Sequence, residues 1–224
     1  MYFKIYGQMR TGTNYISTLL LNNFLDTTVF MNIGGWKHGK LIEYPNKFQL
    51  VNRVDINTKN NIENYNIIDI FKNNNVNFLV IIKNPYMWIK SISIFTNHAI
   101  TPKFVNNYIT QWNDIYLNYK DYIENKRAYL VKYEELLEKT NETLDKIKNK
   151  FNLIKKNSEY ILENNVLSAN NDSNIGITKK ITFNKNKYIS PNISEYLSND
   201  IIRLINENID KTLMKFYEYD LVIV

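Results

Sequence analysis

The 224-residue sequence contains no cysteine, only two histidines, six glycines and four prolines. Without cysteine the chain can form no disulfide, no thiolate metal site and no cysteine nucleophile. No apolar run approaches the roughly 18 residues that a membrane-spanning helix needs. No charged segment with a following apolar stretch, the pattern of a secretory signal, comes before the first apolar run at Tyr2. We therefore expect a soluble, cytoplasmic protein with no membrane span.

The charge balance is basic. Lysine and arginine number 28 against 22 acidic residues, which gives a formal net charge of +6. A basic chain favours an anionic ligand, such as a nucleotide, a sulfated or phosphorylated substrate, nucleic acid or an acidic membrane surface, although a lysine-rich solvated surface explains the same number. The dense Lys/Arg runs typical of nucleic-acid-binding tails are missing, so we expect no nucleic-acid partner.

Strand-like and helical segments alternate along the chain. The expected strands are apolar runs at 2–6, 78–82 and 128–131, with a short apolar piece at 28–33. Helical spacing is found after Gly12, at 62–71, from Pro85 to about Thr96, from Pro102, and at 134–137, 142–151 and 193–216. Residues 34–39, 164–173 and 184–191 indicate loops, and 47–54 a strand or an extended lid. With no repeat and no linker, we expect an α/β fold with one domain over residues 1–224, in which helices cover both faces of a central parallel sheet.

The first motif follows the strand expected at Tyr2–Tyr6. Gly7 and Gly12 bound a loop, and apolar residues at helical spacing come next. A strand, a glycine-bounded loop and a helix is the arrangement that surrounds a phosphate with backbone N–H groups. Two glycines separated by four residues also frame the Walker A loop, but Thr13 stands where that loop has its lysine, and Arg10 lies inside the loop instead. The segment therefore predicts a phosphate loop that is not an ordinary ATP or GTP loop.

The second motif follows the most strand-like run of the chain, Phe78–Ile82. It begins with Lys83-Asn84-Pro85 and reaches Ser91 eight positions after Lys83. Open parallel sheets bind ligands at the carboxyl ends of their strands. Because Pro85 is suited to the first turn of a helix, we expect Ser91 to face Lys83 from that helix.

Together these motifs resemble the sulfotransferases that use 3′-phosphoadenosine 5′-phosphosulfate. In that family a Lys/Arg-Ser-Gly-Thr-Thr-Trp loop holds the 5′-phosphosulfate, as Arg10–Tyr15 would here. A segment that begins Arg-Asn-Pro and ends in serine eight positions on holds the 3′-phosphate, as Lys83–Ser91 would here, with lysine in place of arginine. Tyr133-Glu-Glu-Leu136 is similar to a third family segment, Tyr-Glu-Asp-Leu.

The resemblance implies a P-loop NTPase-like sulfotransferase architecture, the donor 3′-phosphoadenosine 5′-phosphosulfate with adenosine 3′,5′-bisphosphate as product, and no metal. It implies a catalytic role for Arg10 near the bridging oxygen of the donor. The implied cofactor-binding residues are Arg10, Thr11, Gly12, Thr13, Asn14, Tyr15, Lys83 and Ser91. Because lysine binds phosphate as a point charge rather than as a fork, we expect weaker or less selective recognition of the 3′-phosphate.

The family usually has a late Arg-Lys-Gly segment over the 3′-phosphate, and this chain lacks it. Lys179 and Lys180, followed by Lys185 and Lys187, lie in the corresponding stretch. Lys179 and Lys180 are therefore predicted cofactor-binding residues, with ordinary solvated lysines as the alternative.

An acceptor hydroxyl also needs a general base. His38 is the predicted catalytic base, because Lys37-His38 is similar to a Lys-x-His segment between the two cofactor motifs of many sulfotransferases. Glu43 and Asp55 remain alternatives, while His98 is expected at the surface. Trp36 is expected either to stack on a ring of the ligands or to pack in the core.

The sequence does not identify the acceptor, for which a glycan, a phenol or a lipid hydroxyl all remain open. Aromatic residues of the helix after Pro102 are expected either to line an acceptor cleft or to pack in the core: Tyr108, Trp112, Tyr116 and Tyr119. Two other functions stay open. A P-loop kinase would need the missing lysine and an aspartate at a strand end, and a non-catalytic nucleotide- or nucleic-acid-binding module would leave the basic charge without a catalytic role.

Overall fold

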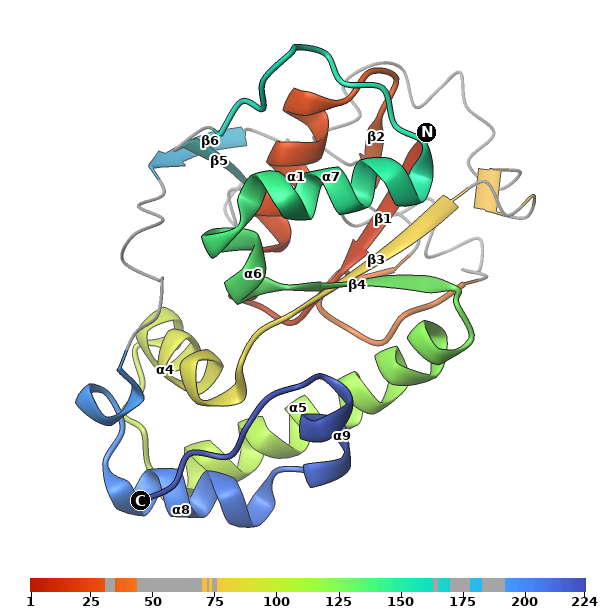
Figure 1. Cartoon of the computed structure of the whole chain (residues 1–224). Coiled ribbons are helices and arrows are strands. Elements are labelled where there is room, and N and C mark those ends of the chain that lie inside the picture. Colours follow the sequence, from red (N-terminus) through yellow and green to blue (C-terminus); the bar gives the residue numbers. More distant parts are fainter. Residues whose placement is uncertain are drawn as a thin grey trace.

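A four-stranded parallel sheet forms the centre of the molecule (Figure 1). The structure, a computed structural model, describes residues 1–30, 35–43, 70–71, 73, 76–162, 165–169, 178–182 and 192–224. The strands are β1 (Tyr2–Tyr6), β2 (Thr28–Phe30), β3 (Val76–Ile82) and β4 (Ala128–Lys132), in the order β2-β1-β3-β4. The predicted α/β fold with a central parallel sheet is confirmed.

Strand β3 is one of the two central strands of this sheet, beside β1. Its residues Phe78 to Ile82 are all buried, with side chains alternating between the two faces. A continuous apolar run of this kind is expected where helices cover both faces of a parallel sheet. The register pairs Tyr6 of β1 with Val80, and Ile82 with Lys132 of β4, so these three strands end at one common edge.

Helices cover both faces of the sheet, as predicted (Figure 1). On one face lie α1 (Thr13–Asn23), α6 (Tyr133–Glu138) and α7 (Thr140–Phe151), which pack with Leu79 and Ile81 of β3. On the other face lie α4 (Pro85–Thr96), α5 (Pro102–Glu124), α8 (Asn199–Asn208) and α9 (Lys211–Phe216), which pack with Val80 and Ile82. No helix in the described ranges is long and apolar enough to cross a membrane.

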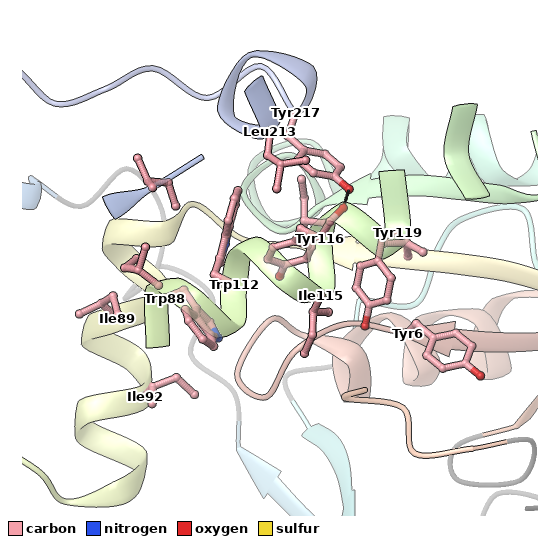
Figure 2. Packing of buried hydrophobic residues seen from close by; sticks show 14 of the residues in the cluster. Tyr6, Trp88, Ile89, Ile92, Trp112, Ile115, Tyr116, Tyr119, Leu213 and Tyr217 are labelled. Atoms are coloured by element: carbon pink, nitrogen blue, oxygen red, sulfur yellow. Dashed lines mark hydrogen bonds between the residues drawn. The ribbon is translucent and has the colours of Figure 1, made fainter. Parts of the chain in front are cut away.

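The aromatic residues of α5 belong to the core (Figure 2). Trp112, Tyr116 and Tyr119 are completely buried, and the hydroxyl of Tyr217 donates a 2.7 Å hydrogen bond to the carbonyl of Tyr116. Of the predicted set only Tyr108 is partly exposed, and its ring meets Trp88 edge to face at 5.7 Å. The alternative that these residues line an acceptor cleft is therefore wrong for the three buried ones, because packing against α9 and the sheet removes them from solvent.

Helix α4 begins and ends at residues suited to those positions. The side chain of Asn84 accepts a 3.1 Å hydrogen bond from the Tyr86 amide, and Pro85 occupies the first turn. Asn97 ends the helix in the left-handed conformation, with φ of 54°. These local signals explain why the predicted bounds of this helix match the structure.

Two predictions of local structure differ from the structure. Within the loop expected at 164–173, strand β5 (Asn165–Ala169) pairs antiparallel with β6 (Thr178–Thr182), because its partner is a separate segment that periodicity does not reveal. The helix expected over 193–216 is divided into the 3-10 turn η4 (Ile193–Glu195), α8 and α9. Ser198 and Asp210 cap the starts of α8 and α9, so a new helix begins after each of them and the helical path is interrupted before each.

Some predicted segments cannot be compared with the structure. Residues 47–54, 184–191 and most of 62–71 lie outside the described residues.

Candidate active site

Three chain segments meet at the carboxyl edge of the sheet. The loop predicted to bind phosphate (Gly7–Gly12, called the phosphate loop below) follows β1. Lys83 and Asn84 follow β3, and Tyr133 begins α6 directly after β4. The chain passes from β1 to β2 on one side and then to β3 and β4 on the other, so the strand order reverses between β1 and β3. Open α/β sheets usually bind their ligands at such a point of reversal. The fold therefore brings the two motifs that were 71 to 76 residues apart in the chain to one place.

Close packing fixes the phosphate loop between β3 and α6. Gly12 has φ of 90°, and a Cβ atom on it would lie 2.6 Å from a ring carbon of Tyr133. A Cβ atom on Gly7 would lie 2.6 Å from the carbonyl oxygen of Ile81. Both positions therefore require glycine, Gly12 also because of its left-handed backbone.

The first backbone N–H groups of α1 lie at the end of this loop and have no partner within the helix. Gly12, the capping residue, offers no side-chain acceptor, and the amide of Ile16 makes the 3.1 Å bond to the Gly12 carbonyl that opens the helix. The amides of Thr13, Asn14 and Tyr15 precede that bond, at the positive end of the helix dipole. The arrangement suits an anion.

The predicted loop residues differ in what their side chains do. The hydroxyl of Thr11 is buried and donates 2.7 Å to the carbonyl of Gln8, so it stabilises the loop from within. Thr13 is buried at the start of α1, and Asn14 accepts a hydrogen bond from Lys37. Tyr15 lies in the core on the α1 face, where burial raises the pKa of its hydroxyl and Thr140 is its hydrogen-bond partner. This placement favours a packing role for Tyr15 over contact with a cofactor.

Arg10 is the exposed residue of the loop. Its backbone is left-handed, with φ of 67°, and its guanidinium lies 5.3 Å from the ring centroid of Phe95 near the end of α4. Non-glycine residues seldom adopt this conformation, and such positions concentrate at functional sites. Arg10 thus lies on the exposed side of the loop, with its charge accessible to a ligand.

Lys83 and Ser91 are in direct contact. The ammonium group donates a 2.7 Å hydrogen bond to the hydroxyl of Ser91, which in turn donates 2.9 Å to the carbonyl of Met87. Lys83 is only 3% exposed and lies 4.5 Å from the ring centroid of Tyr133. Burial lowers the pKa of Lys83 to about 8; the Glu134 carboxylate opposes this shift, and Arg10 and Lys90 add to it. The structure thus joins the two ends of the predicted second motif.

Residues 35–39 attach to the phosphate loop. The Gly7 amide donates to the Lys37 carbonyl at 2.9 Å, and Nδ1 of His38 lies 2.7 Å from the Gly7 carbonyl oxygen. Because a carbonyl oxygen only accepts, Nδ1 carries the hydrogen and Nε2 keeps a lone pair. Burial, followed by the charge of Lys37, lowers the pKa of His38 to about 4, so the imidazole is neutral at pH 7.

Several residues that sequence reasoning missed hold this site together. The indole of Trp88 donates 2.8 Å to the carbonyl of Met9, and Gln8 donates 3.0 Å to the carbonyl of Gln111. Lys4 is completely buried in β1 and donates 2.7 Å to the carbonyl of Gly35. The position of Lys4 inside an apolar strand is a sequence signal that could have identified it. No local sequence signal marks Trp88 or Gln8 as residues that support the site.

The remaining candidates lie elsewhere or are unassigned. Glu43 pairs with Arg127 at 2.6 Å, beside the amino end of β4, and is therefore at the opposite edge of the sheet. His98 is exposed, as expected, whereas Trp36 is 46% exposed and meets His38 edge to face at 5.4 Å. Asp55 lies outside the described residues.

Lys179 and Lys180 belong to strand β6, and their part in cofactor binding stays a prediction. Within the described parts of the chain, no group of three or more histidine or acidic residues is arranged to hold a metal ion.

Comparison with known proteins rests on the fold. No family model matches the sequence, and no curated protein does. A solved structure, the sulfotransferase domain from the curacin biosynthetic pathway, matches with a TM-score of 0.51 over 99% of this chain and 98% of that one, at 10% sequence identity. At this identity the similarity shows the fold alone. The chain has a sulfotransferase-like α/β fold.

Proposed function

We propose that this protein is a sulfotransferase that uses 3′-phosphoadenosine 5′-phosphosulfate. The observation that carries the proposal is the buried 2.7 Å contact between Lys83, which follows β3, and Ser91 of α4. The phosphate loop after β1 and the Lys83–Ser91 pair after β3 are two neighbouring anion sites. They match a nucleotide that carries phosphate groups on both the 3′ and the 5′ oxygen of its ribose. The phosphate loop would bind the 5′-phosphosulfate, and Lys83 with Ser91 the 3′-phosphate.

The electrostatics of Lys83 support an anionic ligand. Burial disfavours its ammonium form, and Arg10 and Lys90 add repulsion, with Glu134 as the opposing charge. A phosphate beside Lys83 would offset both penalties through charge-assisted hydrogen bonds. The donor set of ammonium, hydroxyl and helix-end amides therefore fits phosphate and sulfate oxygens.

The same residues account for the chemistry. The acceptor oxygen forms a bond to sulfur while the bridging S–O bond breaks, and the electron pair stays on the departing phosphate. Arg10 and the first-turn amides of α1 would stabilise that charge. The proton of the acceptor hydroxyl would pass to Nε2 of His38, because Nδ1 already donates to Gly7. The acceptor is a hydroxyl compound of the glycan, phenol or lipid class.

One observation favours a second candidate, a non-catalytic nucleotide-binding module. A base whose pKa is about 4 accepts a proton weakly at pH 7. A kinase is less well supported, because the residue that follows β3 is Lys83 rather than an aspartate that would hold Mg²⁺.

Labelled-sulfate transfer separates the two candidates. The protein would be incubated with the 35S-labelled donor and panels of phenols, glycans and lipids, while calorimetry measures binding of adenosine 3′,5′-bisphosphate, ATP·Mg²⁺ and single-stranded oligonucleotides. Transfer to one panel together with selective bisphosphate binding supports the sulfotransferase. Bisphosphate binding without any transfer supports the binding module. Binding of ATP·Mg²⁺ alone would refute the sulfotransferase and would leave a kinase or an ATP-binding module.

A further inference from the structure

The C-terminal segment Glu218–Val222 returns to the start of α4, far from it in sequence (Figure 1). The amide of Val222 donates 3.1 Å to the hydroxyl of Tyr86 in the first turn of α4. Asn206 of α8 contacts the same hydroxyl, and its side-chain amide donates 2.9 Å to the carbonyl of Val222. One turn of α4 is thus tied to the end of the chain.

A second connection passes through the carboxylate of Glu134. One oxygen accepts a 2.8 Å hydrogen bond from the hydroxyl of Tyr219, and the other accepts a 2.9 Å bond from the backbone amide of Asn84. Burial, followed by the charge of Glu134, raises the pKa of Tyr219 well above its usual value, so this hydroxyl keeps its proton and donates. Both oxygens of Glu134 therefore join the C-terminal segment to the residue that follows Lys83.

The contacts converge on the residues proposed for the 3′-phosphate. Asn84 caps α4 and directly follows Lys83, while Ser91 lies two turns further along the same helix. Tyr133, the neighbour of Glu134, places its ring 4.5 Å from the Lys83 ammonium and against Gly12. The start of α4 is therefore fixed from two sides, by α6 and by the end of the chain.

From these contacts, and on the basis of the proposed function, we infer that Tyr219 is a positioning residue for the 3′-phosphate site, acting through Glu134 on the strand end that carries Lys83. Recognition by a buried lysine and a helix hydroxyl depends on their separation, and supporting hydrogen bonds determine that separation. The C-terminal segment would thus set the selectivity for a 3′-phosphate without touching the ligand.

The test compares two ligands that differ only in the 3′-phosphate. Calorimetry on the full chain would measure the affinities for adenosine 3′,5′-bisphosphate and adenosine 5′-monophosphate, and their ratio is the readout. Tyr219→Phe removes only the hydroxyl and should lower this ratio about three- to tenfold, with the monophosphate affinity unchanged. A merely structural defect would weaken both ligands equally.

Tyr160→Phe is the matched control. Tyr160 also donates a 2.7 Å hydrogen bond to a carboxylate, that of Asp145 on α7. Tyr160→Phe therefore removes the same kind of hydrogen bond at a place away from Lys83. The ratio should stay unchanged in this variant.

A double variant tests the route. If Tyr219 acts through Lys83, Tyr219→Phe should cause no further loss of the ratio in a Lys83→Met background. Additive losses would overturn the inference, as would a wild-type ratio in Tyr219→Phe. A wild-type protein that does not prefer the bisphosphate at all would instead refute the proposed function, so the two failures are distinguishable.

Discussion

Lys83 and Ser91 are eight residues apart in the chain, yet the ammonium of one lies 2.7 Å from the hydroxyl of the other. The contact is possible because β3 ends at Ile82 and α4 turns back at once, with Asn84 as its cap. Lys83 directly after β3 and Ser91 on α4 thereby form one polar site next to the phosphate loop.

Ser91→Ala should weaken binding of adenosine 3′,5′-bisphosphate about five- to tenfold, because the 3′-phosphate would lose a hydroxyl partner and Lys83 its anchor. Ser93→Ala is the control on the same helix, since its hydroxyl donates to the His98 carbonyl at 2.6 Å in an exposed position. Calorimetry at pH 7 checks both variants. An unchanged affinity in Ser91→Ala would remove Ser91 from the site.

Bisphosphate affinity should depend on pH in the alkaline range. The pKa of Lys83 is about 8 in the free protein, held there by burial, with Glu134 opposing and Arg10 and Lys90 contributing. Below that value the ammonium is present, and as pH rises above it the binding form is lost, so affinity should decline from about pH 8 upward. Titrations at pH 7, 8 and 9 measure the decline.

Lys83→Arg provides the comparison for this pH effect. A guanidinium stays charged throughout the range and can bind phosphate as a fork, so the decline should disappear. A decline of equal size in this variant would show that another group causes it.

His38→Ala should reduce sulfuryl transfer about 10²- to 10⁴-fold while bisphosphate affinity is kept, because a general base acts on the acceptor and not on the nucleotide. In the wild type, kcat/KM should fall as pH drops through about 4, where His38 becomes protonated and can no longer accept a proton. His98→Ala, at an exposed position, should behave as wild type. Full transfer activity in His38→Ala would assign the base elsewhere.

Gly12→Ala should destabilise the fold by about 2 kcal/mol or more, because the left-handed backbone and the Tyr133 ring both exclude a Cβ atom. Gly39→Ala is the matched control, since its Cβ would meet the nearest atom at an ordinary 3.5 Å. Urea denaturation compares the two variants. Equal stability of both would contradict the close packing of the phosphate loop against α6.

Local signals in the sequence determined how much could be predicted. The apolar run of β3, the Asn84-Pro85 start of α4 and the glycines after β1 act within a few residues. Strand β3, helix α4 and the strand–loop–helix arrangement at the start of the chain were therefore predicted correctly. The pairing of Lys83 with Ser91 followed from the same local geometry.

Contacts between distant segments could not be read in this way. The Glu134 bridge joins residues 50 and 85 positions away, and β5 takes its strand form from pairing with β6. Tyr15 was assigned a cofactor contact from its place in the first motif, and Trp112 a possible acceptor contact because aromatic residues suit both a site and a core. Only the packing of the helices places both residues inside.

Lys83 supplies the most direct test of the central claim, that the strand end after β3 binds the 3′-phosphate of a sulfuryl donor. Calorimetry would compare adenosine 3′,5′-bisphosphate with adenosine 5′-monophosphate on the wild type, on Lys83→Met and on Lys211→Met, whose exposed lysine lies on α9. We expect the wild type and Lys211→Met to bind the bisphosphate at least about tenfold more tightly than the monophosphate, and Lys83→Met to lose that preference. Equal affinities for the two nucleotides in the wild type, or an undiminished preference in Lys83→Met, would contradict the claim.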